Sequence, residues 1–249
     1  MEQSQVHDDS GSISSGSTAV ASEGLPSLAK SFKIGVLALQ GAFIEHVEIL
    51  QKLGIVATEV RLPEDLLEID GLIIPGGEST AIGLIADRWG LTEPLKDWVR
   101  SGRPTWGTCA GMIMLSKTVT GKMKQGQMVL GGLDTVVHRN YFGSQLGSFV
   151  SRVKVRNISV APELFQTNSV SEAVFIRAPI ITEHGDNVKV IATIENPTIG
   201  SKEAHESAST AEPIVAVQQG NILATAFHPE MTSDTRWHEL FIAIVNNSL

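Results

Sequence analysis

The only cysteine of the chain, Cys109, lies in the segment Gly107-Thr108-Cys109-Ala110-Gly111. This is a cysteine version of the G-x-S-x-G nucleophile elbow, in which a sharp strand-to-helix turn exposes the nucleophile. Flanking glycines let the strand and helix approach each other closely. The free N–H groups that begin the helix favour a thiolate, and that of Ala110 can help to hold an oxyanion. A lone cysteine can also be a small buried hydrophobe, but this setting favours a nucleophile.

A cysteine nucleophile needs a base, and His228 is the candidate among seven histidines. It closes an apolar strand pattern in Phe227-His228-Pro229-Glu230, where the proline favours an extended backbone at the preceding residue and ends the strand. Glu230 can hydrogen-bond one imidazole nitrogen, which leaves the other free to take the thiol proton. Cys109, His228 and Glu230 therefore form a candidate catalytic triad.

The remaining histidines outside the candidate motifs have simpler interpretations. His7 lies in a polar tail and His205 in a polar loop, so both are expected to be solvated. His46 lies within a helical segment, where a capping or surface role is expected. His184 lies beside a turn glycine, and His238 lies in the last helical segment.

A metal site is an alternative interpretation of His228, Glu230, Asp234 and His238. These residues have no compact H-x-x-x-H or thiolate spacing, and a cluster of hard ligands would leave Cys109 unexplained. A plain strand-end turn is a further alternative as long as Cys109 is ignored. With Cys109 included, the triad is favoured over both, and no metal is expected.

A second glycine motif follows another strand pattern, in Pro75-Gly76-Gly77-Glu78-Ser79-Thr80. Paired glycines after a strand let backbone N–H groups face a ligand, as an oxyanion hole requires. The alternative is a tight turn that leads into a helix with Ser79 or Thr80 as its cap. A phosphate-binding loop is disfavoured because the lysine of the Walker pattern is missing.

The surrounding elements are predicted to place these motifs at the carboxyl ends of parallel strands, where open α/β sheets bind ligands. The first half alternates strand and helix patterns, which implies a parallel sheet covered on both faces. The middle is rich in β patterns, predicts no clear helix and favours antiparallel additions to the sheet. The predicted strands are Lys33–Leu39, Ile55–Val60, Gly71–Ile74, Pro104–Gly107, Thr135–His138, Ser148–Val155, Ala173–Ile176, Val188–Ile194, Ile214–Gln218 and Ile222–Phe227. The predicted helices are Ala42–Leu53, Ser79–Trp89, Glu93–Arg100, Ala110 to about Lys117, and Thr235–Val245.

Composition limits the possible partners and compartments. The net charge of −8 gives no sign of binding to nucleic acid or to an anionic membrane, and no apolar run approaches the roughly 20 residues that cross a bilayer. One cysteine permits no internal disulfide, which favours a reducing compartment such as the cytoplasm. Residues 1–31 hold nine serines and little apolar periodicity, so we expect a disordered tail before one domain at 32–249. The polar stretch at about 195–212 is expected to be an exposed insertion loop.

Together the motifs resemble those of class I glutamine amidotransferases with a Cys-His-Glu triad. Three further segments resemble the Pdx2 family, the glutaminase subunit of pyridoxal 5′-phosphate synthase. They are Leu39-Gln40-Gly41-Ala42, His138-Arg139-Asn140 before Phe142-Gly143, and Phe175-Ile176-Arg177-Ala178-Pro179. The resemblance runs from about Lys33 to Val245, and it implies a three-layer, flavodoxin-like α/β fold with a mostly parallel central sheet.

The resemblance also implies roles for individual residues. Cys109 would be the nucleophile, His228 the base and Glu230 its partner, with Gly77 and Ala110 as oxyanion donors. L-Glutamine would be bound by Gly77, Glu78, Ser79, Arg139, Ile176 and Arg177, and Gln40 would lie in a loop that responds to the partner. That partner would be the (β/α)8-barrel synthase subunit of the Pdx1 family, which would receive the ammonia. No cofactor is implied for this chain.

Departures from the family pattern and rival functions remain. Ser144 stands where the family often carries a basic residue, which puts the contacts near Arg139 in doubt. One rival is the glutaminase of another pathway, such as imidazole glycerol phosphate synthase. A catalytically silent subunit and a stand-alone cysteine hydrolase are the others.

Overall fold

The computed structural model describes residues 1, 32–121, 128–142, 147–195 and 212–249. Most of the predicted tail and of the predicted insertion loop therefore lies outside the described residues. Gly143 and Ser144 also lie outside them. The expectations for these segments remain predictions.

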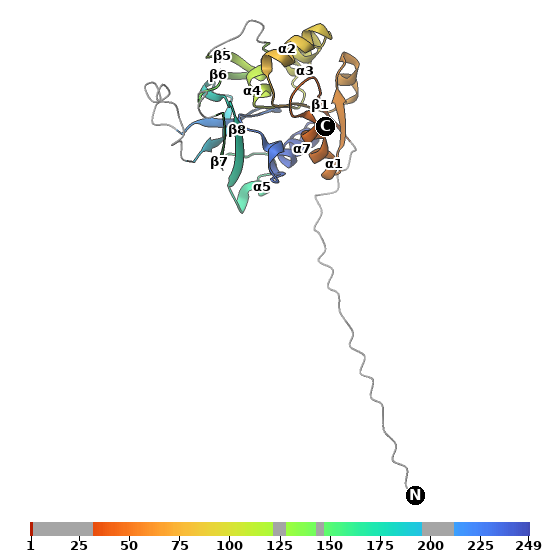
Figure 1. Cartoon of the computed structure of the whole chain (residues 1–249), viewed down its shortest axis with the longest axis vertical. Coiled ribbons are helices and arrows are strands. Elements are labelled where there is room, and N and C mark those ends of the chain that lie inside the picture. Colours follow the sequence, from red (N-terminus) through yellow and green to blue (C-terminus); the bar gives the residue numbers. More distant parts are fainter. Residues whose placement is uncertain (2–31, 122–127, 143–146, 196–211) are drawn as a thin grey trace.

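One mixed sheet organises the described part of the chain (Figure 1). Its main path runs β2-β1-β3-β4-β12-β11-β10-β7-β8, and β9 joins β11 to β6, which in turn pairs with β5. The strands are β1 (Lys33–Leu37), β2 (Val56–Val60), β3 (Gly71–Ile74), β4 (Thr105–Thr108), β5 (Ser116–Thr120), β6 (Leu133–His138), β7 (Ser148–Val155), β8 (Val170–Ile176), β9 (Ile180–His184), β10 (Lys189–Ile194), β11 (Ile214–Gln219) and β12 (Ile222–Thr225).

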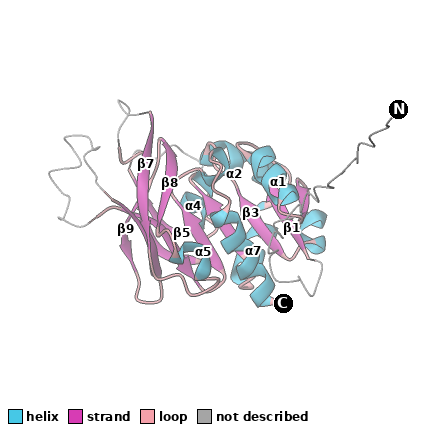
Figure 2. Cartoon of the chain, turned by 90° about the horizontal axis from the view of Figure 1, so that it is seen from below, coloured by secondary structure: helices cyan, strands magenta, loops and turns pink. Residues whose placement is uncertain are grey.

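The helices gather around the parallel strands, whereas β7, β8 and β9 lie towards the other side of the molecule (Figure 2). The pairs β2–β1, β1–β3, β3–β4 and β4–β12 are all parallel. The α-helices are α1 (Phe43–Lys52), α2 (Ser79–Arg88), α3 (Thr92–Arg100), α4 (Ala110–Leu115), α5 (Glu163–Gln166) and α7 (Arg236–Ser248), and the 3-10 helices are η1 (Pro63–Glu68) and η2 (Pro229–Met231).

Neighbouring side chains on β4 show how helices cover both faces. The ring of Trp106 lies 5.5 Å from that of His46 on α1 and 5.7 Å from that of Phe241 on α7. Adjacent residues of a strand point to opposite faces. Accordingly, Thr105 Oγ1 accepts a hydrogen bond of 3.1 Å from Trp98 Nε1 on α3. Helices α1 and α7 therefore share one face of the sheet, and α3 lies on the other.

The predicted α/β fold with a mostly parallel sheet and antiparallel additions is confirmed. The β-rich middle contributes the antiparallel pairs β7–β8, β10–β7, β10–β11 and β6–β9. Within this region, however, β5 pairs with β6 in parallel. Two elements of the middle were missed, β9 and the helix α5, and the four residues of α5 are too few to produce a clear periodic pattern.

The predicted end of the helix after Cys109 is wrong. Helix α4 ends at Leu115, and the chain passes directly into β5 at Ser116. All six residues of α4 are buried, so it lies inside the fold rather than along its surface. The β-branched residues of Ser116–Thr120 instead pair with β6, an interaction that local helical spacing cannot reveal.

Candidate active site

Cys109 lies in a strained turn between β4 and α4. Its backbone φ is 45°, in the left-handed region that non-glycine residues seldom occupy. A Cβ atom on Gly107 would lie 2.5 Å from the backbone carbon of Gly111, and one on Gly111 would overlap the carbonyl oxygen of Ile74. The glycines thus have the close-packing role that the sequence predicts, and Cys109 has the backbone expected of an elbow.

His228 lies beyond the end of β12, where its backbone N–H donates to Val174 O on β8 at 2.8 Å. Its Nδ1 is 2.7 Å from Glu230 Oε1, and its imidazole lies close enough to the Cys109 side chain for that side chain to raise its pKa. All three residues are buried. The structure therefore brings together the thiol, the imidazole and the carboxylate that were predicted from separate motifs.

The charge of His228 is set by these two partners. Burial by itself lowers the pKa of His228, but the hydrogen bonds and negative charges of Cys109 and Glu230 outweigh it and raise the pKa to about 10. The imidazole is therefore held as an imidazolium at neutral pH, between the side chains of Cys109 and Glu230. A positively charged imidazolium beside a thiol favours its ionised, nucleophilic form and holds a proton that can be given to a leaving group.

Gly76 has a role that the sequence analysis missed. A Cβ atom at this position would overlap Cε1 of the His228 ring. The sequence predicts that the paired glycines present backbone N–H groups or form a tight turn into a helix, whereas the first of them also makes room for the imidazole. Glycine pairs are common, so the sequence carried no specific signal for this role.

The loops after β1 and β3 are joined to each other. Gln40 Oε1 accepts a hydrogen bond of 2.8 Å from Glu78 N–H, and Ala42 N–H donates to Gly76 O at 3.0 Å. A side chain on Gly41, whose φ is 99°, would overlap this same Gly76 oxygen. Gln40 therefore contacts the Gly77-Glu78 turn directly.

Glu78, rather than Ser79 or Thr80, caps helix α2. Its carboxylate accepts from Thr80 N–H at 3.2 Å and from Ala81 N–H at 2.9 Å. The alternative of a turn capped by Ser79 or Thr80 is therefore wrong about the capping residue, because the side chain of Glu78 is long enough to reach back to the orphan N–H groups of the first turn. Glu78 Oε1 is also 3.6 Å from Arg139 Nη2, so two predicted substrate-binding residues of opposite charge are adjacent.

Ile176 and Arg177 lie at the end of β8. The carbonyl oxygen of Ile176 is 3.7 Å from Cys109 Sγ, which places this backbone group beside the thiol. Arg177 is exposed, has a φ of 46° and donates its backbone N–H to Gly147 O at 2.9 Å. The end of β8 thus reaches the site by its backbone.

The expected surface or capping role of His46 is wrong. His46 and His238 are both fully buried, with His46 Nδ1 2.9 Å from His238 Nε2. His46 Nε2 in turn lies 3.3 Å from Glu230 Oε2. A signal was present in the sequence, because His46 follows Phe43 by three residues and precedes Leu50 by four, which places it on the apolar side of α1.

The four residues of the metal alternative do not share one site. Asp234 Oδ2 accepts from Ser171 Oγ at 2.8 Å and is 2.7 Å from Arg236 Nη2. Across the described ranges, no group of three His, Cys, Asp or Glu side chains could hold a metal ion. In the same ranges, no helix has the length and apolar character that crossing a membrane requires.

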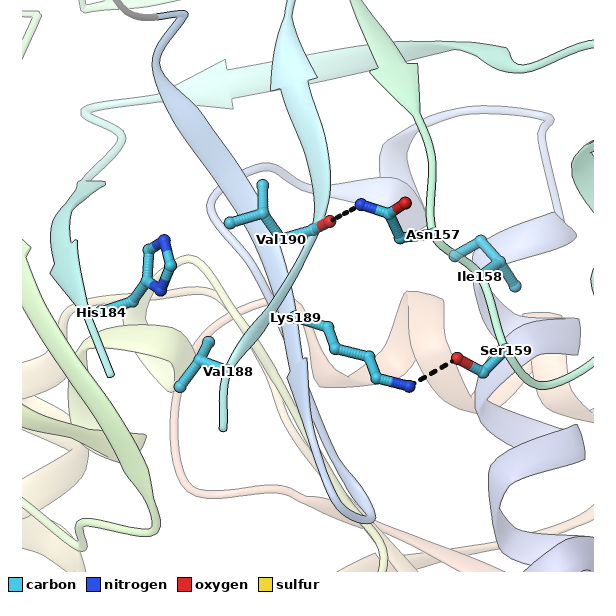
Figure 3. Close-up of a pocket in the computed structure, with 7 residues that line it drawn as sticks. All are labelled: Asn157, Ile158, Ser159, His184, Val188, Lys189 and Val190. Carbon is cyan, nitrogen blue, oxygen red and sulfur yellow. Dashed lines mark hydrogen bonds between the residues drawn. The ribbon is translucent and has the colours of Figure 1, made fainter. Parts of the chain in front are cut away.

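A cavity of about 540 Å³ lies apart from these residues, beside β9 and β10 (Figure 3). Its polar groups are bound to one another: Asn157 Nδ2 donates to Val190 O at 3.1 Å, and Lys189 Nζ donates to Ser159 Oγ at 2.8 Å. No cysteine lines it, and its one histidine, His184, is bonded to a neighbouring backbone oxygen. We therefore place the candidate active site at Cys109 and not at this cavity.

A cysteine elbow on a mixed α/β sheet, with a His-Glu pair beyond a later strand, is the arrangement expected of a class I glutamine amidotransferase. Residues 36–247 match the SNO glutamine amidotransferase family, and the chain belongs to that family. It is 43% identical to the "Probable pyridoxal 5'-phosphate synthase subunit PDX2" of Arabidopsis thaliana, over 84% of each chain. It is 45% identical to the "Pyridoxal 5'-phosphate synthase subunit PdxT" of Herpetosiphon aurantiacus, over 85% of this chain and 99% of that one.

Solved structures share the fold. One described as "Crystal structure of glutamine amidotransferase" has a TM-score of 0.69 and 38% identity, covering 85% of this chain and 98% of its own. A second, "Structure of PurLQS from Thermotoga maritima", has a TM-score of 0.58 and 17% identity, covering 88% of this chain and all of its own. At that identity the second likeness concerns the fold alone.

Proposed function

We propose that this protein is the glutaminase subunit of a pyridoxal 5′-phosphate synthase. It hydrolyses L-glutamine to glutamate and ammonia and delivers the ammonia to the synthase subunit for vitamin B6 biosynthesis. The relatives named for that synthase support the pathway. The observation that carries the chemistry is the buried cluster in which His228 is bonded to Glu230 and interacts with Cys109.

The reaction proceeds in two steps. The Cys109 thiolate attacks the side-chain carbonyl carbon of glutamine, and the C–N bond breaks as His228 gives its proton to the departing ammonia. The product is a glutamyl thioester. His228, now neutral, takes a proton from water, whose oxygen attacks the thioester and releases glutamate and the thiolate. Glu230 orients the imidazole and balances its charge in both steps.

The backbone N–H groups of Gly77 and Ala110 hold the oxyanion of each tetrahedral intermediate. Ala110 is the first residue of α4, where a backbone N–H lacks an intrahelical acceptor. Loss of one such donor is expected to raise the barrier by about 3 kcal/mol. Gln40 contacts the adjacent Glu78 N–H, so a movement of Gln40 would alter the turn that carries Gly77.

The charged ends of glutamine need fixed charges of opposite sign. Glu78 suits the α-ammonium group, and the guanidinium groups of Arg139 and Arg177 suit the α-carboxylate. Ser79 and the backbone of Ile176 complete the substrate-binding set. The proximity of Glu78 to Arg139, at 3.6 Å, supports one compact site for both ends of the amino acid.

The acceptor of the ammonia is a (β/α)8-barrel synthase subunit of the Pdx1 family. Ammonia released into water at neutral pH is mostly protonated and loses its nucleophilicity, so direct transfer between subunits preserves its reactivity. Docking of the synthase moves the Gln40 loop and so promotes formation of the oxyanion hole. The single cysteine of the chain fits a reducing compartment, and we infer a cytoplasmic location.

The first prediction tests this function with Cys109→Ala in the reconstituted synthase. Glutamine-dependent formation of pyridoxal 5′-phosphate should be lost because the nucleophile is absent, whereas ammonia-dependent formation by the partner should persist. Product formation is measured with each nitrogen source. Loss of both activities would indicate a structural role, and retained glutamine-dependent activity would overturn the proposal.

A further inference from the structure

Two buried histidines extend the candidate triad beyond Glu230. His46 comes from α1 and His238 from α7, and both rings are fully buried. His46 Nδ1 is 2.9 Å from His238 Nε2, while His46 Nε2 is 3.3 Å from Glu230 Oε2 and 3.5 Å from Thr108 Oγ1. A polar series therefore runs from α7 through α1 to the carboxylate.

We propose that His46, with its tautomer fixed by His238, is a positioning residue that orients and stabilises the Glu230 carboxylate against His228. This role rests on the proposed function, in which Glu230 acts on His228. Glu230 links His46 to the catalytic base, because its Oε1 binds His228 at 2.7 Å while its Oε2 faces His46.

The need for His46 follows from the burial of Glu230, whose side chain is 0% exposed. Oε2 makes no well-directed hydrogen bond to any described residue, and its contact with His46 at 3.3 Å is longer than the usual charge-assisted bond of about 2.7–2.9 Å. An ionised oxygen that has lost water must be compensated by a nearby donor dipole. Within the described chain, His46 supplies it.

The protonation states of His46 and His238 determine which ring nitrogens donate and which accept hydrogen bonds. Burial, followed by the charges of His238 and His228, keeps the pKa of His46 well below its ordinary value, and burial lowers the pKa of His238 to about 3. Both rings are therefore neutral, each with one donor and one acceptor nitrogen. The titratable groups around His46 are His238 on α7 together with His228 and Glu230, while β4 contributes the uncharged Trp106.

One tautomer satisfies all of these contacts. Because Glu230 Oε2 needs a donor, His46 carries its hydrogen on Nε2, and its Nδ1 accepts from His238 Nε2–H. His238 Nδ1 is then the unprotonated nitrogen, and it has no hydrogen-bond partner among the described residues. A neutral donor orients the carboxylate without cancelling its charge, so that Glu230 keeps its full effect on His228.

The test compares His46→Gln with His46→Leu in the full chain, using His184→Leu as a control that removes an exposed imidazole elsewhere. The amide of glutamine can still donate towards Glu230, whereas leucine cannot. Without the donor, burial favours a neutral carboxyl, so the support of the His228 imidazolium weakens. The measurements are the pH profile of Cys109 alkylation by iodoacetamide and, with the synthase present, kcat and KM for glutamine.

We expect His46→Leu to move the rise of the alkylation profile up by about one pH unit, because a weaker imidazolium stabilises the thiolate less, and to lower kcat about tenfold, with KM little changed. His46→Gln should restore both, and His184→Leu should match the wild type. Equal losses in the two His46 variants with an unchanged pH profile, or no loss in either, would overturn the proposal. A wild-type chain without glutaminase activity would instead refute the proposed function.

Discussion

At the scale of single residues, the protonation state of His228 determines the chemistry of the site. The pKa of His228 is raised to about 10 because its bonds to Cys109 and Glu230 outweigh the effect of burial. A raised pKa means that the imidazolium persists through neutral pH and is lost only as pH rises towards 10. Cys109 is therefore expected to be reactive over a broad neutral range.

The second prediction concerns His228→Asn. Asparagine cannot carry the charge that stabilises the thiolate, so alkylation of Cys109 by iodoacetamide should become strongly pH-dependent. We expect the rate at pH 7 to fall about tenfold or more, with recovery near the ordinary thiol pKa of about 8.5. Rates are measured from pH 6 to 10, and a glutamine-like electrophile should no longer form its adduct efficiently. A profile identical to that of the wild type would remove His228 from the role of base.

His46 and His238 belong to the same scale, because they lie behind the buried pair of His228 and Glu230. Three further buried polar contacts lie behind it, between Thr108, His46, His238 and Glu230. Partly satisfied buried networks are costly, so the series fixes a unique arrangement only while each member keeps its tautomer. The His46 variants described above test that requirement.

At the scale of elements, the elbow depends on how closely α4 packs against the sheet. Gly111 lies against the carbonyl of Ile74 on β3, and Gly107 lies against the backbone of Gly111. The helix is short and entirely buried, so it is packed against other parts of the protein on every side. Backbone contact between neighbouring elements therefore holds Cys109 at its unusual φ.

The third prediction tests this contact with Gly111→Ala. The added methyl group would overlap the Ile74 oxygen, and overpacking of this kind costs about 1–3 kcal/mol in the free energy of unfolding. Gly147→Ala is the matched control, because a Cβ atom there would have no neighbour within 4 Å among the described residues. Urea unfolding measures both, and the control should lie within about 0.5 kcal/mol of the wild type. Equal stability of the two variants would contradict close packing at α4.

At the scale of the whole molecule, α7 connects the two halves of the sheet. Its Phe241 and Val245 pack against Gly71 on β3, in the parallel half. At its start, Arg236 Nη2 donates to Val170 O on β8 at 3.0 Å, and Trp237 Nε1 donates to Ser171 Oγ at 3.1 Å. Because β8 also bonds the backbone of His228, this connection helps to place the base opposite the thiol.

The fourth prediction concerns Asp234, which holds both Arg236 and Ser171. Burial raises the pKa of Asp234, but these hydrogen bonds outweigh it and leave the pKa below its ordinary 3.8. A depressed folded pKa contributes stability that is present above about pH 4 and is lost as pH falls through the folded value. Asp234→Asn should therefore destabilise the fold at pH 7 by about 1.5 kcal/mol, with a smaller difference below pH 3.

Its matched control is Asp97→Asn, which removes an exposed carboxylate paired with Arg100. Exposed pairs contribute little, so this change should stay within about 0.5 kcal/mol at every pH. Unfolding free energies are measured between pH 7 and 2.5. If the loss of unfolding free energy in Asp234→Asn were as large at pH 2.5 as at pH 7, the carboxylate charge of Asp234 would not be what stabilises its contacts with Arg236 and Ser171.

Local sequence determined much of this protein. The elbow glycines, the proline after His228 and the alternation of strand and helix patterns are properties of contiguous residues. They predicted the α/β fold, most element positions and the residues of the candidate triad. The boundary between α4 and β5 was beyond their reach, because a pairing with the distant strand β6 decided it.

Only the tertiary structure decided which polar residues would be buried together. His46, Thr108, Glu230 and His238 lie in four separate segments, and their contacts exist because α1 and α7 pack on the same face of the sheet. The capping of α2 by Glu78 and the space that Gly76 leaves for His228 were likewise fixed in three dimensions. Sequence spacing gives the face of a helix, but the partner that meets this face is set by packing between distant elements.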